Sequence, residues 1–151
     1  MRIKGAISEL SEQRNRDLYE CYCKLLKEQL RLYGRANKLS LLNKVVNMTA
    51  KRYWISPERG YSVIDSIRDG KIKTSTSKNK MKLYLALYDE FVKFKEKNPN
   101  MSDMKIAEEI VFLPAPCFGL EPRVAGFIIN KMEKICRKEK INRLNALYQQ
   151  H

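Results

Sequence analysis

The side chains best suited to chemistry lie in the segment Lys51-Arg52-Tyr53-Trp54, where two cations adjoin two aromatic rings. Lysine and arginine pair with phosphates, and an exposed aromatic ring can stack on a nucleobase. The tetrapeptide therefore predicts a contact with nucleic acid. In the alternative interpretation, Tyr53 or Trp54 fills the core beneath a turn.

The segment that contains this tetrapeptide has a counterpart 65 positions later in the chain. Residues 45–67 align with residues 110–132 without a gap, and the register extends upstream, where Leu18-Tyr19 aligns with Leu83-Tyr84. The pattern predicts two copies of one small helical unit. The aligned pairs include Val46 with Val111, Ala50 with Ala115, Ile55 with Leu120, Pro57 with Pro122 and Ile64 with Ile129.

A comparison of the two copies separates the possible roles of the aromatic residues. Tyr53 aligns with Phe118, so we expect both rings to fill the core. Trp54 aligns with Gly119, which indicates that the fold does not require the tryptophan. We therefore expect Lys51, Arg52 and Trp54 to contact nucleic acid in the first copy alone, because Pro116, Cys117 and Gly119 replace them in the second.

The helix after this turn is expected to begin at Pro57, with Ser56 as its N-cap. In a tri-helical, helix-turn-helix-like unit it would be the recognition helix, and Arg59 and Ser62 would meet DNA. The connection from Met48 is about eight residues long, whereas a helix-turn-helix uses three or four. In the alternative interpretation, this helix only packs against its neighbours.

A basic, Ser/Thr-rich run follows the helix and reads DGKIKTSTSKNK over residues 69–80. Its composition is typical of a linker, and its cations suit contact with a nucleic-acid backbone. The alternative is a solvated linker that its own charge keeps extended. We expect a linker that also adds nonspecific affinity through Arg68, Lys71 and Lys73.

The overall charge supports an anionic partner. The 151 residues include 30 Lys+Arg and 17 Asp+Glu, a formal net charge of +13. Such an excess favours nucleic acid, with DNA preferred to RNA, or an anionic membrane surface. No apolar run approaches the ~18 residues of a membrane span, so we expect no membrane partner. The four cysteines read as free thiols of a reducing compartment, which predicts a cytoplasmic protein.

Catalysis and metal binding find little support in the sequence. The only histidine is His151, and there is no glycine-rich phosphate loop or nucleophile beside a plausible base. Cys21 and Cys23 have a spacing that is poor for zinc. We therefore expect a protein that is not an enzyme, with no catalytic residues, no metal site and no cofactor.

The periodicity of apolar residues predicts an all-α fold of two tandem tri-helical, helix-turn-helix-like units with a long C-terminal helix. Helices are expected over about 14–33, 38–48, 57–68, 81–95, 103–112 and 122–148. The last could pair with a second copy of the chain through Ile141, Leu144 and Tyr148, or fold back across the first unit. The expected organisation is a flexible arm over 1–13, a first unit over 14–68, a basic linker over 69–80 and a second unit over 81–151.

Residues 50–59, AKRYWISPER, carry the one family resemblance in the sequence. They resemble an A-x-R-aromatic-x-aliphatic-S-P-E-R turn that joins two helices in short uncharacterised proteins of bacterial phages and mobile elements. The resemblance implies an accessory protein of a phage or mobile element, without a specific activity. The second copy departs from the pattern at Cys117 and Gly119.

Two functional hypotheses follow. The first is a nucleic-acid-binding accessory protein that uses the basic aromatic turn and the following helix. The alternative is a structural or assembly protein, such as a virion component or an adaptor, whose basic face binds an acidic partner. A continuous basic face from the Lys51 turn to the linker would favour the first, and scattered charge would favour the second.

Overall fold

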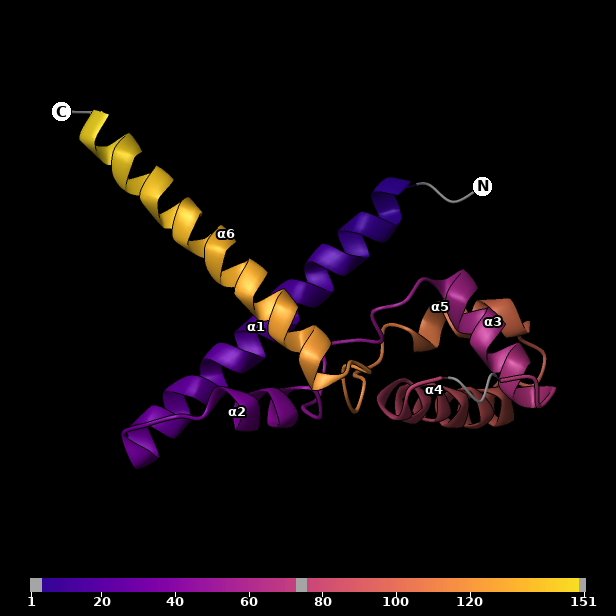
Figure 1. Ribbon diagram of the computed structural model, residues 1–151. Helices are drawn as coiled ribbons and strands as arrows, with labels where there is room; N and C mark the ends of the chain where they lie inside the picture. Colours follow the sequence, from indigo (N-terminus) through magenta and orange to yellow (C-terminus); the bar gives the residue numbers. More distant parts are fainter. Residues whose placement is uncertain (1–3, 73–75, 150–151) are drawn as a thin grey trace.

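The computed structural model describes residues 4–72 and 76–149, and its regular elements are six α-helices (Figure 1). The all-α class is therefore confirmed for this part of the chain. The helices are α1 (Lys4–Tyr33), α2 (Lys38–Val45), α3 (Pro57–Arg68), α4 (Lys78–Lys97), α5 (Asp103–Ile110) and α6 (Pro122–Gln149).

Polar caps fix where several helices begin. The Ser56 hydroxyl accepts a hydrogen bond from the backbone N–H of Arg59, and Pro57 occupies the first helical positions of α3, as expected. Asn37 and Ser102 cap α2 and α5 in the same way. Ser77 is a cap that we did not predict. It begins α4 at Lys78, so residues 78–80 are helical and the expected linker ends earlier.

The expected flexible arm over residues 1–13 is wrong for residues 4–13, because α1 begins at Lys4. Gly5 disfavours a helix there, but glycine costs only about 1 kcal/mol relative to alanine in a helix. The good helix formers Glu9, Leu10 and Glu12 follow it closely. Residues 1–3 lie outside the described part.

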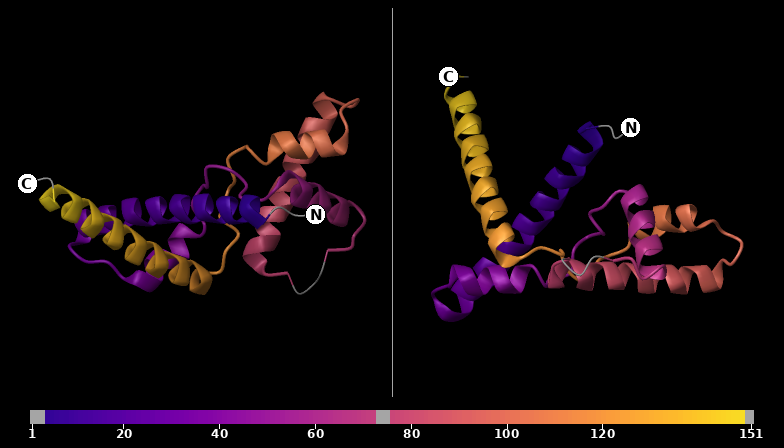
Figure 2. Two further views of the ribbon diagram at one scale, coloured as in Figure 1. Left: turned by 90° about the horizontal axis from the view of Figure 1, so that it is seen from above. Right: turned by 45° about the vertical axis from the view of Figure 1, so that its right-hand side comes forward.

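The packing of the helices does not follow the order of the chain. α3 contacts α4 and α5, whereas α6 contacts α1 and α2. We call α1, α2 and α6 the terminal bundle and α3, α4 and α5 the central bundle; they lie on opposite sides of the molecule (Figures 1 and 2). The two units expected over 14–68 and 81–151 are thus not confirmed as packing units, because each third helix lies on the other helix pair.

Two crossing segments, residues 46–56 and 111–121, carry the chain from one bundle to the other. Ala50 and Ala115 form an antiparallel bridge, with N···O distances of 2.9 and 3.1 Å between their backbones. The backbone N–H of Tyr53 donates to Val111 O, and that of Phe118 donates to Val46 O, both at 3.0 Å. These bonds join positions that the offset of 65 residues makes equivalent, as if a local two-fold axis passed between the segments.

The aromatic rings of the crossing segments fill the core. Tyr53 is 1% exposed and Phe118 is 5% exposed, and both belong to one continuous apolar cluster. The prediction that these equivalent rings are buried is confirmed. Trp54 is half-buried, so it is more exposed than Tyr53.

The last helix extends beyond its bundle. Met132 is the last buried residue of α6, and residues 137–149 are all exposed. We call residues 134–149 the C-terminal arm; at 1.5 Å per residue it is about 24 Å long. In Figure 2 it diverges from α1 instead of folding back across the bundle.

Candidate nucleic-acid interface

Lys51, the first residue of the predicted basic turn, is exposed but paired. Its Nζ lies 2.9 Å from Glu20 Oε2 on α1. This hydrogen bond, which the Lys51 amine donates, lowers the pKa of the Glu20 carboxyl and raises the pKa of the Lys51 amine. The backbone N–H of Lys51 donates to Asp17 Oδ2 at 2.9 Å. The positive charge of Lys51 is thus balanced by its own neighbour.

Arg52 is half-buried and braces its own segment. Its Nε donates to Tyr53 O at 3.1 Å, and one Nη donates to Ile55 O at 3.2 Å. Its guanidinium lies 4.2 Å from the centroid of the Phe112 ring and 5.3 Å from that of Trp54. Burial lowers the pKa of Arg52. These contacts use two of the five N–H groups of the guanidinium and place two aromatic rings beside it, which leaves fewer donors for a phosphate.

Trp54 is bonded within the fold, although the comparison of the two copies predicts that the fold does not require it. Its indole Nε1 donates to Asp17 Oδ2 at 2.8 Å, and Asp17 is 3% exposed. A buried carboxylate needs such partners, because an unpaired charge in the core is costly. At the equivalent position, Gly119 has a φ of +69°, and a Cβ there would lie 2.6 Å from Leu83 Cδ2.

The remaining predicted contact residues belong to α3 and the segment after it. Arg59 and Ser62 are exposed on α3. Arg68 pairs with Asp103 at 2.9 Å and Asp65 at 3.4 Å, and the bond to Asp103 raises its pKa. Lys71 is exposed, and Lys73 lies outside the described residues.

The predicted site therefore does not form one continuous basic face. The Lys51 turn closes onto α1 of the terminal bundle, whereas Arg59, Ser62 and Arg68 belong to α3 of the central bundle. Three of the predicted cations, Lys51, Arg52 and Arg68, are already bonded within the protein.

The largest group of unpaired positive charges in the described part of the chain lies on α6, outside the predicted site. Six exposed cations fall within residues 131–143, where Glu133 and Glu139 are the acids. Glu139 pairs with Arg16 at 3.8 Å, and none of the six cations forms an ion pair in the described part of the chain. The six are Lys131, Lys134, Arg137, Lys138, Lys140 and Arg143.

Spacing places cations and an aromatic ring on one face of this helix. Lys134 follows Phe127 by seven residues, and Arg137 and Lys138 follow Lys134 by three and four, so all four share a face. Phe127 is 66% exposed, and the Arg123 guanidinium lies 6.0 Å from its ring centroid. The sequence carries one sign of this site, the basic composition of residues 131–143. The predicted site lies elsewhere because the second copy lacks the basic aromatic turn of the first.

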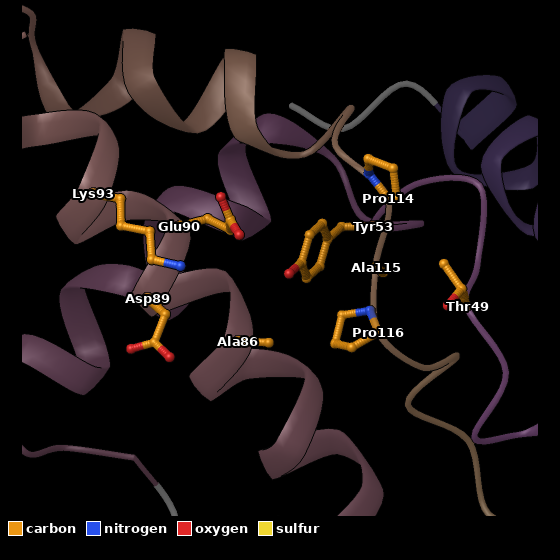
Figure 3. A pocket seen from close by; sticks show the side chains of 9 residues that line it. All are labelled: Thr49, Tyr53, Ala86, Asp89, Glu90, Lys93, Pro114, Ala115 and Pro116. Carbon is orange, nitrogen blue, oxygen red and sulfur yellow. The ribbon is translucent and has the colours of Figure 1, made fainter. Parts of the chain in front are cut away.

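A pocket of about 280 Å³ lies between α4 and the crossing segments (Figure 3). The Tyr53 ring points toward Asp89, Glu90 and Lys93 of α4. Burial, with a smaller contribution from Glu90, raises the pKa of Tyr53 to about 12. At the equivalent places Phe118 and Leu25 stand for Tyr53 and Glu90, so the phenol and the neighbouring Glu90 carboxyl are particular to this side.

Comparison with family models, curated proteins and solved structures found no match to the chain. The resemblance of residues 50–59 to phage and mobile-element proteins thus stays a hypothesis. Within the described residues, no helix combines the length and apolar character needed to cross a membrane. The same part of the chain holds no group of three or more His, Cys, Asp or Glu side chains placed to bind a metal.

Proposed function

We propose that this protein binds nucleic acid and that α6 is its contact helix. The observation that carries the proposal is the group of six exposed cations over residues 131–143, none of which pairs with an acid in the described part of the chain. Free lysines and arginines release condensed counterions when they neutralise phosphates, which drives association. Arg59 and Lys71 add charge elsewhere on the surface.

The shape of the C-terminal arm favours duplex DNA over RNA. A helix with its side chains is about 10–12 Å across, which fits the ~12 Å major groove of B-DNA. The deep, narrow major groove of A-form RNA does not admit it. From residue 137 onward every residue of the arm is exposed, and its ion pair in the described part of the chain is the one between Glu139 and Arg16, so it can enter a groove once that surface pair opens. The resemblance of residues 50–59 suggests the setting, an accessory protein of a phage or mobile element.

The test is the salt dependence of binding, measured by fluorescence anisotropy with labelled duplex DNA. We expect Lys134→Ala/Arg137→Ala/Lys138→Ala to weaken binding and to reduce the slope of log K against log salt by roughly two to three units. The matched control, Lys93→Ala/Lys97→Ala/Lys105→Ala, removes three exposed charges from the central bundle and should change the slope less. Equal effects of both variants, or no binding at low salt, would refute the proposal.

One observation favours the alternative, a structural or assembly protein. Beyond Lys140 the arm exposes Ile141, Leu144 and Tyr148, which share one face of α6 at intervals of three and four residues. Such a stripe can pair with the same stripe of a second copy. Sedimentation of the wild type and of Ile141→Ser/Leu144→Ser separates the functions, because only an assembly protein would lose its oligomeric state.

A further inference from the structure

The tip of the α1–α2 hairpin exposes an unusual amount of apolar surface. Every residue from 30 to 40 is exposed, and Figure 1 shows the tip at the edge of the molecule, far from the central bundle. Leu30 and Tyr33 lie three residues apart and so share a face of α1. The large apolar side chains of the tip are Leu30, Leu32, Tyr33 and Leu39, exposed by 46%, 51%, 67% and 66%.

The equivalent tip of the α4–α5 hairpin shows that the fold does not require this exposure. Lys95, Lys97 and Asn98 stand where the first tip has Leu30, Leu32 and Tyr33. The Lys95 amine bridges this tip, donating to Met101 O at 2.8 Å and to Asp103 at 3.2 Å. One tip is thus closed by polar contacts, and the other keeps apolar side chains in water, which marks an interaction surface.

The charge around the apolar tip defines its partner. The residues in and beside the tip, 27–40, hold four cations and the single acid Glu28. None of these cations forms an ion pair in the described part of the chain, and the amine of Lys38 donates to Asn130. The cations are Lys27, Arg31, Arg35 and Lys38.

We propose that the α1–α2 tip docks an acidic amphipathic segment of a partner protein. Such a segment covers the leucines with its apolar face and pairs its carboxylates with the basic rim. A second copy is disfavoured, because a symmetric contact would bring two identical clusters of cations together. Nucleic acid would pair with the cations but would leave the leucines in water. This function lies apart from the proposed DNA contact on the C-terminal arm (Figures 1 and 2).

The test uses the full chain and two labelled peptides that differ only in charge. One is an amphipathic helix with leucines at intervals of three and four residues and glutamates elsewhere, and the other has lysine for glutamate. By anisotropy, we expect the acidic peptide to bind more tightly by a factor of about ten or more. Leu30→Ser/Tyr33→Ser should lose this binding. The control Leu85→Ser/Val92→Ser alters two exposed apolar residues of α4 and should keep it.

Other occupants give different results. Loss of DNA affinity in Leu30→Ser/Tyr33→Ser would assign the tip to nucleic acid, and a dimer that this variant dissolves would assign it to a second copy. Either result overturns the proposal, as does equal binding of the two peptides or no binding of the acidic one. Arg31→Glu/Arg35→Glu guards against a folding defect, because it should reverse the preference between the peptides while the melting temperature stays the same.

Discussion

The two bundles are joined by equivalent hydrogen bonds but close their crossing segments in different ways. Beside the first segment, the carboxylate of Asp17 accepts from the indole of Trp54 and from the backbone of Lys51. Beside the second, Lys82 takes the place of Asp17, and Gly119 lies directly against Leu83. Lys51 and Trp54, which the sequence suggests as a binding turn, thus hold the first crossing segment to Asp17 of α1. At the second crossing segment, Gly119 instead allows the backbone to pack closely against Leu83 of α4.

The bundles also differ in how they treat charge. In the central bundle, Arg68 and Lys95 both pair with Asp103, which ties α3 and α4 to α5. In the terminal bundle, the equivalent of Asp103 is Lys38, and the cations of α6 extend into solvent. In the central bundle, cations thus hold three helices together through one carboxylate, whereas the six cations of α6 have no acidic partner in the described part of the chain.

The largest effect tests whether Tyr53 and Phe118, the two aromatic plugs that fill the core beneath the crossing segments, are equivalent. Truncation of a buried aromatic ring leaves a cavity and loses its transfer free energy, so Tyr53→Ala and Phe118→Ala should each cost about 3–5 kcal/mol. Urea denaturation of both variants measures the loss. Because the plugs occupy equivalent sites, the two losses should agree to within about 1 kcal/mol. If one of the two variants left the urea midpoint unchanged, the two rings would not be equivalent.

The next largest effect compares two alanine substitutions, one at Gly119 in the second crossing segment and one at Gly34, which has no neighbour within 4 Å of an added Cβ. Gly34 and Gly119 both have a φ of +69°, but only Gly119 faces a neighbour, at 2.6 Å from an added Cβ. A left-handed alanine costs about 1–2 kcal/mol, and overpacking adds about 1–3 kcal/mol. Gly119→Ala should therefore destabilise the protein by about 3 kcal/mol, and Gly34→Ala by about 1 kcal/mol. Equal losses in urea denaturation would show that Leu83 moves aside freely.

The sequence predicts local features of this fold well. The caps Asn37, Ser56 and Ser102 and the plugs Tyr53 and Phe118 follow from side-chain chemistry and helical periodicity, which act over a few residues. The sequence does not predict that α3 packs on the α4–α5 pair and α6 on the α1–α2 pair. An apolar stripe has the same period whichever pair it covers, and only the long connection before Pro57 indicated an unusual path.

The candidate site was harder to predict because its bonding partners are remote in the chain. Asp17 lies 34 residues before Lys51 and 37 before Trp54, and a buried aspartate has no periodic signature. The free cations of α6 were visible as composition. Their lack of acidic partners depends on the path of the helix away from its bundle, which requires the structure.

A smaller effect tests the role of Asp17. Asp17→Ala would leave the indole of Trp54 and the backbone N–H of Lys51 without their acceptor, which should cost about 2 kcal/mol. Lys82→Ala, at the equivalent and exposed position, should stay within about 0.5 kcal/mol of the wild type. Urea denaturation measures both. A harmless Asp17→Ala would mean that water replaces the carboxylate, and the asymmetry of the two closures would lose its energetic meaning.

The smallest effect concerns the one polar atom by which the plugs differ. Tyr53→Phe gives the first plug the ring of the second. Because the Tyr53 hydroxyl has no hydrogen-bond partner in the described part of the chain, the change should alter stability at neutral pH by less than about 1 kcal/mol.

Above pH 10 the stabilities of the wild type and Tyr53→Phe should diverge. Tyr53 titrates at about 12 in the folded protein and near 10 when unfolded, so between these values the unfolded state holds fewer protons. The wild type therefore loses stability as pH rises through this window, and Tyr53→Phe should lose less. Tyr19, whose pKa burial also raises to about 12, remains in both proteins, so their difference isolates Tyr53. The measurement is the urea midpoint of both proteins below pH 10 and between pH 10 and 12. If the two midpoints changed with pH in parallel, the pKa of Tyr53 would be the same in the folded and unfolded states, and its phenol would be fully hydrated in the pocket.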